Sequence, residues 1–138
     1  MYTEEQINKL QANPKKLAKQ LNAALPSFDE LAQHEMLPRI IGIGMMLPSK
    51  RERIATAVQH MVAQMMKNKW YRYYSVEDNE AVVYDHASRE YVVTMEEFEV
   101  LTKIMFTQWL GIQLDFTQEQ QDLYCAFKWQ SKMYSILN

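Results

Sequence analysis

Apolar residues recur along much of the chain at the spacing of one face of an α-helix. Stripes of this kind run from Leu17 to Leu25, from Ile54 to Met66 and from Phe98 to Ile112. Residues three and four apart lie on the same side of a helix, so each stripe predicts an amphipathic helix with a buried face. These segments are therefore expected to supply the helical part of the core.

The starts of the helices are marked by capping boxes, in which Ser or Thr is followed three residues later by Glu or Gln. Each side chain of the pair satisfies a backbone N–H that the first helical turn leaves without a partner. Asn13 followed by Pro14 marks a further start, because proline at the first helical position loses no hydrogen bond. Six helices are therefore predicted, beginning after Thr3, Asn13, Ser27, Ser49, Thr94 and Thr117.

The pattern changes between Trp70 and Thr94, where aromatic and β-branched residues dominate. Three short runs, Trp70–Val76, Ala81–His86 and Arg89–Thr94, are separated by turn-forming residues. Short runs with tight connections predict a three-stranded antiparallel β-meander that needs a helix on one face. The expected fold is a mostly helical single domain of the α+β class, with about six helices and the meander between the fourth and the fifth.

Charge is distributed unevenly over this single domain, residues 1–138. Residues 1–72 carry 11 Lys or Arg against 6 Asp or Glu, residues 73–138 carry 4 against 11, and the net charge is −2. The domain therefore divides into a basic helical part (1–69), the β-meander (70–94) and an acidic C-terminal pair of helices (95–138). This asymmetry favours a charged partner, or a second copy whose basic part meets the acidic part.

Two predicted helices begin with cations, although the positive end of a helix dipole favours acidic side chains. These cations follow Pro14 in one helix and Ser49 in the other. They are either solvated surface residues or a site where cations and backbone N–H groups converge on phosphate or on the carboxylates of a partner. The candidate partner- or anion-binding residues are Lys15, Lys16, Lys19, Lys50, Arg51 and Arg53.

The segment that follows Thr117 predicts one final helix with two apolar faces. One face contains Leu123, Phe127 and Tyr134, and the other contains Trp129, Met133 and Ile136. A helix that is apolar on two sides lies in the middle of a core or is covered by a partner. Since aromatic residues supply much of the energy of protein interfaces, we expect an apolar interface at Trp129, Met133 and Ile136.

No pattern typical of catalysis or metal binding stands out. The three histidines are widely spaced, and the single Cys125 lies among apolar residues. Gly42 and Gly44 lack the order of residues that a phosphate-binding loop requires. Neither a metal nor a cofactor is therefore expected, and an enzyme with a site near Asp85 and His86 is the weakest hypothesis.

The chain is expected to be soluble and cytoplasmic. Its longest apolar run, Ile40–Leu47, has eight residues, whereas a membrane helix needs roughly 20. The N-terminal residues are polar and acidic, unlike a signal peptide. One cysteine cannot form an intrachain disulfide, which suits a reducing compartment.

These observations favour a small non-enzymatic interaction module, such as an adaptor, an inhibitor or an assembly subunit. Its expected partner is another protein or a second copy of itself in a homodimer, with no role for a membrane. By analogy, such a small chain without catalytic residues resembles the accessory proteins of phages and mobile elements. The alternative is a nucleic-acid-binding protein that contacts phosphates with its basic N-terminal half.

Overall fold

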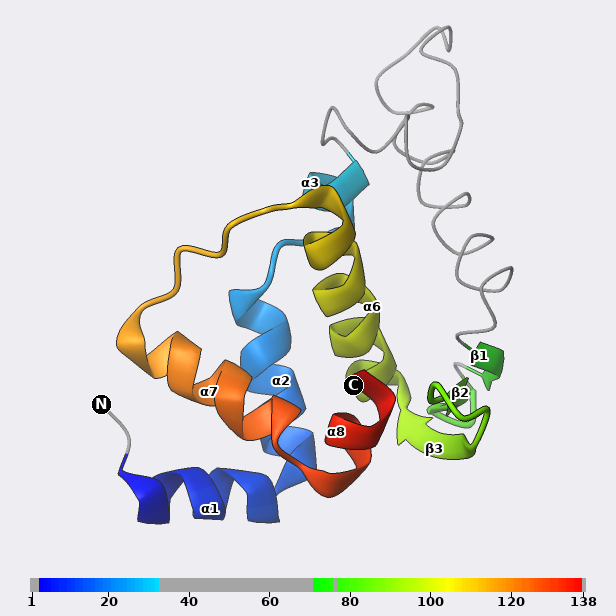
Figure 1. Cartoon of the computed structure of the whole chain (residues 1–138), viewed down its shortest axis with the longest axis horizontal. Helices are drawn as coiled ribbons and strands as arrows, with labels where there is room; N and C mark the ends of the chain where they lie inside the picture. Colours follow the sequence, from blue (N-terminus) through cyan, green and yellow to red (C-terminus); the bar gives the residue numbers. More distant parts are fainter. Residues whose placement is uncertain (1–2, 33–70, 76, 138) are drawn as a thin grey trace, which may run out of the picture.

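A computed structural model describes residues 3–32, 71–75 and 77–137. The fold is α+β, as predicted, and Figure 1 shows a group of helices with a small sheet at one side. The predicted helix after Ser49, the methionines of the 54–66 stripe and the two glycines lie outside the described residues. The described elements are α1 (Glu4–Ala12), α2 (Pro14–Ala24), α3 (Phe28–Ala32), β1 (Tyr71–Ser75), β2 (Glu80–Tyr84), β3 (Glu90–Thr94), α6 (Met95–Leu110), α7 (Gln118–Lys128) and α8 (Ser131–Leu137).

The five predicted helix starts within the described residues form the expected capping hydrogen bonds. At α6, the Thr94 hydroxyl accepts from the Glu97 N–H at 3.1 Å, and the Glu97 carboxylate accepts from the Thr94 N–H at 2.9 Å. The Asn13 side chain accepts from the Lys16 N–H at 3.3 Å, before α2 begins at Pro14. Local hydrogen bonds therefore fix these starts. The same reciprocal pair occurs at Thr3 with Gln6 and at Thr117 with Gln120. At Ser27 the hydroxyl accepts from the Glu30 N–H at 3.1 Å and donates to the Glu30 carboxylate at 3.3 Å.

The three strands form the predicted antiparallel meander, in the order β1-β2-β3. Val82 in the central strand lies opposite Val92 in β3, and Ser75 lies opposite Glu80 across the first hairpin. Strand β2 begins one residue and ends two residues before the predicted positions, whereas β3 begins one residue late and ends at Thr94 as predicted. The predicted ends of the first strand, Trp70 and Val76, lie outside the described residues. Because α6 begins directly after β3, the sheet and the longest of the described helices follow each other without a connecting loop.

Helix α6 is buried on all sides over most of its length. Every residue from Val100 to Thr107 is at most 7% exposed. The predicted core residues Phe98, Leu101, Ile104 and Phe127 are buried, whereas Met61 and Met65 lie outside the described residues. A helix without a solvent face must have neighbours on every side, and α2, α3, β2 and β3 contact it.

The prediction of one final helix with two apolar faces is wrong. Helix α7 ends at Lys128 and α8 begins at Ser131, so the chain changes direction between them. This turn directs Met133 and Ile136 into the same core that contains Phe127. The two apolar faces therefore belong to two helices, and residues 95–138 contain three helices rather than a pair.

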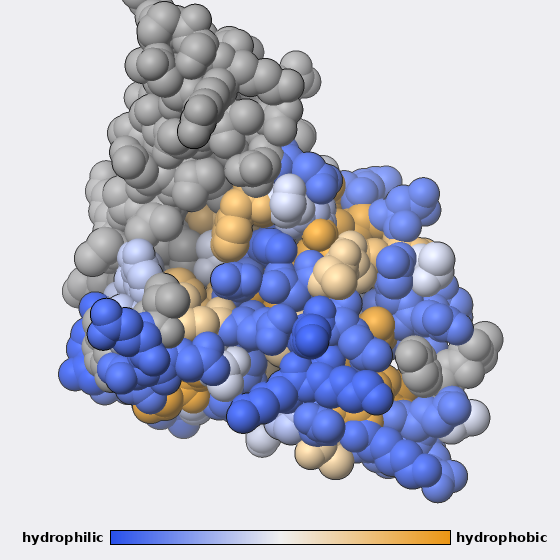
Figure 2. Space-filling model, turned by 180° about the vertical axis from the view of Figure 1, so that it is seen from behind, coloured by the Kyte–Doolittle hydropathy of each residue, from blue (hydrophilic) through white to orange (hydrophobic). Residues whose placement is uncertain are grey.

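The surface of the described residues is mainly polar. Figure 2 shows a face on which hydrophilic residues dominate and apolar residues form only small patches. The large apolar side chains that are exposed within the described residues are Tyr74, Val92, Trp129 and Tyr134. None of the described helices combines the length and the apolar composition that crossing a membrane requires.

Phe127→Ala is expected to lower the free energy of unfolding by about 3–5 kcal/mol, because the ring is fully buried and its loss leaves a cavity. Urea denaturation followed by circular dichroism measures this change. Val92→Ala is the control, since its side chain is 58% exposed and the expected loss is below about 1 kcal/mol. Equal losses in the two variants would contradict the position of α7 in the core.

Candidate functional site

Two aromatic side chains at the α7–α8 turn lie outside the core. The rings of Trp129 and Tyr134 stack with their centroids 5.7 Å apart and an angle of 25° between their planes. Trp129 is 68% exposed and Tyr134 is 50% exposed. We refer to these two residues as the aromatic pair, and it is the most exposed group of neighbouring aromatic rings in the described structure.

The backbone around the aromatic pair is held by hydrogen bonds and by the core. The Trp129 N–H donates to the carbonyl of Cys125 at 3.0 Å and closes α7. The Tyr134 N–H donates to the carbonyl of Gln130 at 2.7 Å. Since the neighbouring Met133 is fully buried, the core anchors the backbone that carries both rings.

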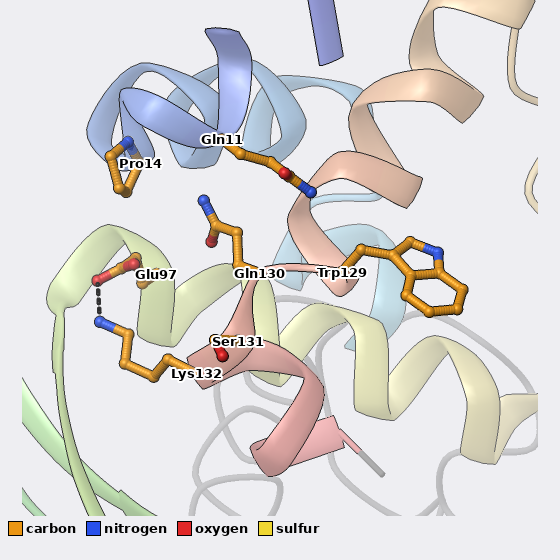
Figure 3. A pocket seen from close by; sticks show the side chains of 7 residues that line it. All are labelled: Gln11, Pro14, Glu97, Trp129, Gln130, Ser131 and Lys132. Atoms are coloured by element: carbon orange, nitrogen blue, oxygen red, sulfur yellow. Dashed lines mark hydrogen bonds and ion pairs between the residues drawn. The ribbon is translucent and has the colours of Figure 1, made fainter. Parts of the chain in front are cut away.

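A cleft of about 290 Å³ lies next to the aromatic pair. It is bordered by the junction between α1 and α2, the start of α6 and the α7–α8 turn (Figure 3). Cavities near 300 Å³ are at the small end of the range for ligand sites, so the cleft fits one or two side chains. Its lining residues are Gln11, Pro14, Glu97, Trp129, Gln130, Ser131 and Lys132.

An ion pair on one side of the cleft attaches α8 to α6. The Lys132 ammonium lies 3.5 Å from Oε1 of Glu97, whose side chain is 4% exposed (Figure 3). The ammonium also donates to the carbonyl of Val92 at 3.3 Å. Because the buried Glu97 carboxylate has Lys132 and the Thr94 N–H as partners, both charges serve the structure.

The amide of Gln130 has an unsatisfied donor at the cleft. Its Nε2 is buried and makes no hydrogen bond, although its side chain projects between Pro14 and Gln11 (Figure 3). Gln11 uses its own Nε2 to donate to the carbonyl of Ala126 at 3.2 Å. A buried donor without a partner costs about 1–3 kcal/mol.

The predicted cations of α2 lie on the surface. Lys15, Lys16 and Lys19 are exposed and form no ion pair with any residue that the structure describes. Lys15 follows Pro14, so the basic start of α2 lies at the border of the cleft. The other predicted cations, Lys50, Arg51 and Arg53, lie outside the described residues, and their role in binding a partner or an anion stays a prediction.

The predicted apolar interface is only partly at the surface. Trp129 is exposed as expected, but Met133 and Ile136 are at most 1% exposed and belong to the core. The break between α7 and α8 is the physical reason, because it turns α8 so that these two side chains point inward. Tyr134, which the sequence pattern assigned to the other apolar face, is the residue that stacks on Trp129.

Asp85 organises the turn between β2 and β3. Its carboxylate accepts from the backbone N–H groups of Ala87 and Arg89, both at 2.9 Å, and from the Tyr91 hydroxyl at 3.1 Å. The Arg89 guanidinium donates to it at 2.8 Å. These bonds explain the tight turn, whereas the neighbouring His86 is exposed. Glu90 lies 3.6 Å from the guanidinium of Arg72, so it belongs to a different ion pair.

The hydrogen bonds to Asp85 change its acidity. Burial alone raises the pKa of this carboxyl, but the bonds from the Arg89 N–H, Tyr91, the Arg89 guanidinium and the Ala87 N–H outweigh burial. The pKa of Asp85 is therefore held below its ordinary value of 3.8. The ionised carboxylate stabilises the folded state.

Lys103 is a buried titratable residue that the sequence analysis missed. Its ammonium donates to Oδ1 of Asn22 at 2.6 Å and lies 5.4 Å from the centre of the Phe28 ring. Burial lowers the pKa of Lys103, although the nearby Glu99 and Glu30 oppose this effect. The position of Lys103 between Leu101 and Ile104 could have indicated a buried lysine. The apolar stripe around it was interpreted only as the buried face of a helix.

Metal ligands do not gather in the part of the chain that the structure describes. No group of three or more His, Cys, Asp or Glu there is arranged to hold a metal ion. Cys125 is half-buried, and the side-chain amide of Gln121 lies 3.5 Å from its sulfur. The aromatic pair and the adjoining cleft are therefore the best candidate site in this part of the chain.

Asp85→Asn is expected to lower the free energy of unfolding at neutral pH, because the amide cannot replace the charge-assisted bonds. Since the pKa of Asp85 is lowered on folding, its contribution is lost as the pH falls through the folded-state pKa. The difference between Asp85→Asn and wild type should therefore shrink in acid. Urea melts at neutral and acidic pH measure it, with the exposed Asp78→Asn as control. A difference that does not change with pH would contradict this role.

Comparisons with known proteins add no functional assignment. No protein-family model matches the sequence, and no curated protein or solved structure is similar to it. The proposal of a function therefore depends on the geometry of the aromatic pair, the cleft and the cations beside them.

Proposed function

We propose that the protein is a small non-enzymatic interaction module, which binds a partner protein through the aromatic pair and the adjoining cleft. The observation that carries this proposal is the stacking of two highly exposed rings, Trp129 and Tyr134, on a turn that the core anchors. Trp and Tyr are the residues most enriched among those that dominate binding energy. An adaptor, an inhibitor or an assembly subunit would use such a surface.

The aromatic pair is organised before a partner binds. Its two rings already contact each other, and their backbone positions follow from α7 and α8. Binding a partner therefore costs little additional side-chain entropy. Covering one such ring contributes about 1.5–3 kcal/mol from the removal of apolar surface from water.

The cleft indicates the chemistry of the partner. Among the described residues that line it, only Glu97 is acidic, and Lys132 neutralises it. Lys15 and Lys16 follow Pro14 at the border of the cleft, and neither forms an ion pair with a described residue. The surface is therefore positive around an apolar centre, which fits a partner that presents an apolar side chain flanked by carboxylates.

Trp129→Ala and Tyr134→Ala are each expected to weaken partner binding at least tenfold, which corresponds to about 1.4 kcal/mol. Neither change should alter the free energy of unfolding by more than about 1 kcal/mol, because both rings are exposed. Wild type and both variants are used as baits to isolate binding partners. The affinity of each recovered complex is then measured with purified components. Val92→Ala, which removes exposed apolar surface elsewhere, should bind like wild type.

Two outcomes of this test identify the partner. A partner retained by wild type and Val92→Ala but lost by Trp129→Ala supports the proposal, once direct binding has been shown. Sedimentation equilibrium tests whether the partner is a second copy of the same chain. A wild-type homodimer that dissociates in Trp129→Ala would show that it is. A direct complex that survives the double change of Trp129 and Tyr134 to alanine would contradict the proposal.

Nucleic acid is the second candidate partner, and the exposed cations of α2 favour it. Phosphates would contact Lys15, Lys16 and Lys19, while the exposed rings could stack on unpaired bases. This hypothesis predicts binding to a single-stranded oligonucleotide that weakens steeply with salt.

Changing Lys15, Lys16 and Lys19 together to glutamine should reduce the slope of log affinity against log salt by about 2–3, if they contact phosphates. Fluorescence anisotropy with a labelled oligonucleotide measures the slope. Lys9→Gln is a matched control, because the Lys9 ammonium already lies 3.9 Å from the Glu5 carboxylate. No binding at low salt would reject the nucleic-acid hypothesis and leave the acidic protein partner.

A further inference from the structure

The connection between α6 and α7, residues 111–117, has the alternation of an extended strand. The side chains of Ile112, Leu114 and Phe116 are partly buried and pack against the core, whereas Gln113 and Asp115 are exposed. Figure 1 shows this connection as a long arm that runs from the end of α6 to the start of α7. Inward and outward side chains that alternate with a period of two are typical of a β-strand.

The backbone of this arm has no neighbouring strand within the described residues. At its start, the N–H groups of Gly111 and Ile112 donate to carbonyls at the end of α6. At its end, the Thr117 N–H donates to the side chain of Gln120 at 3.0 Å. Between these points, residues 113–116 form no backbone–backbone hydrogen bond with another described residue. Their N–H and C=O groups therefore resemble those of a free sheet edge.

A groove of about 370 Å³ lies along this arm. Its opposite wall is formed by the end of α2 and the connection to α3, where Ala23, Ala24 and Pro26 leave space because their side chains are short. Glu30 contributes a carboxylate from one wall and Asp115 from the other. The described lining contains no Lys or Arg, and neither carboxylate forms an ion pair with a described residue. Glu30 also accepts from the Ser27 hydroxyl at 3.3 Å and lies near Lys103, so Asp115 is the less committed of the two carboxylates.

This groove is separate from the cleft beside the aromatic pair. The cleft lies at Pro14, the first residue of α2, and the groove lies at Ala23 and Ala24, the last two. A helix of 11 residues is about 16 Å long, so the two sites are at opposite ends of α2. Their charges are also opposite, because the cleft adjoins cations and the groove contains carboxylates.

We propose that the groove binds an extended basic peptide segment, which adds to residues 113–116 as a β-strand. The unpaired backbone groups of the arm would supply the main-chain hydrogen bonds, as in other complexes formed by strand addition. Glu30 and Asp115 would select Lys or Arg at alternate positions of the peptide, and the alanines and Pro26 would contact the residues between them. At about 3.4 Å per residue, the paired segment of the peptide is four or five residues long.

The probe is an acetylated, amidated peptide of five residues in which lysine alternates with valine. Titration into ¹⁵N-labelled full-length protein is followed by the amide resonances of residues 113–116. We expect saturable shifts centred on these residues, with alternate amides of the arm becoming protected from solvent exchange, since a strand pairs every second residue on one side.

Two modified peptides separate strand addition from simple charge attraction. Methylation of every second backbone nitrogen of the peptide keeps its charge but removes the N–H donors at those positions. Of the two peptides methylated in this way, at odd or at even positions, the one that loses the donors facing the arm should bind at least tenfold more weakly. Replacement of lysine by glutamate should abolish binding. In the protein, Asp115→Asn should weaken binding severalfold, whereas Glu4→Gln, which removes a charge from α1, should have no effect.

Three results would overturn this proposal: no shift in residues 113–116 at saturating peptide, equal binding of the methylated and unmodified peptides, or binding of the glutamate peptide. The result is independent of the function proposed above, because Trp129→Ala leaves the groove unchanged. Loss of peptide binding in Trp129→Ala would place the peptide in the cleft and also contradict the proposal.

Discussion

Helix α6 buries every side chain from Val100 to Thr107, so it has no solvent face and the other elements must surround it. Its polar residues also need partners inside the protein. The Thr102 hydroxyl donates to the Phe98 carbonyl at 2.7 Å within the helix, whereas Lys103 reaches Asn22 on α2. The polar groups of α6 therefore help to fix which elements lie beside it and in which register.

The two proposed binding surfaces lie near opposite ends of α6, since Glu97 in its first turn lines the cleft and Ile112, after its last residue, lines the groove. At one end, Glu97 binds Lys132 and the core takes up Met133, which turns the chain and leaves Trp129 and Tyr134 outside. After the other end, the connection at residues 111–117 leads from α6 to α7 as a single extended arm. Its inward side chains are packed, but its backbone groups at 113–116 have no strand beside them. The requirement to surround α6 thus leaves aromatic rings and unpaired backbone at the surface.

Local patterns in the sequence were sufficient for the starts of α1, α2, α3, α6 and α7 and for the sheet, but not for the start of α8. A capping box needs only residues three apart, and the strands are separated by short turns, so no distant contact decides them. The break at Trp129 was missed because neither glycine nor proline marks it, and Trp129 ends α7 with ordinary backbone angles, φ −89° and ψ 0°. Lys103 was missed because its partner Asn22 is 81 residues away. Trp129 was predicted as a surface residue, but its partner Tyr134 could be identified only after the break was known.

The central claim is that α6 carries the stability of the fold, while α8 is an attached outer element that presents the aromatic pair. Native-state hydrogen exchange at low denaturant concentrations tests this claim directly. The account predicts that amides of residues 100–107 exchange only through global unfolding, and that amides of α8 exchange through a separate opening of lower free energy. Exchange of the α6 amides through an opening that leaves α8 protected would contradict it.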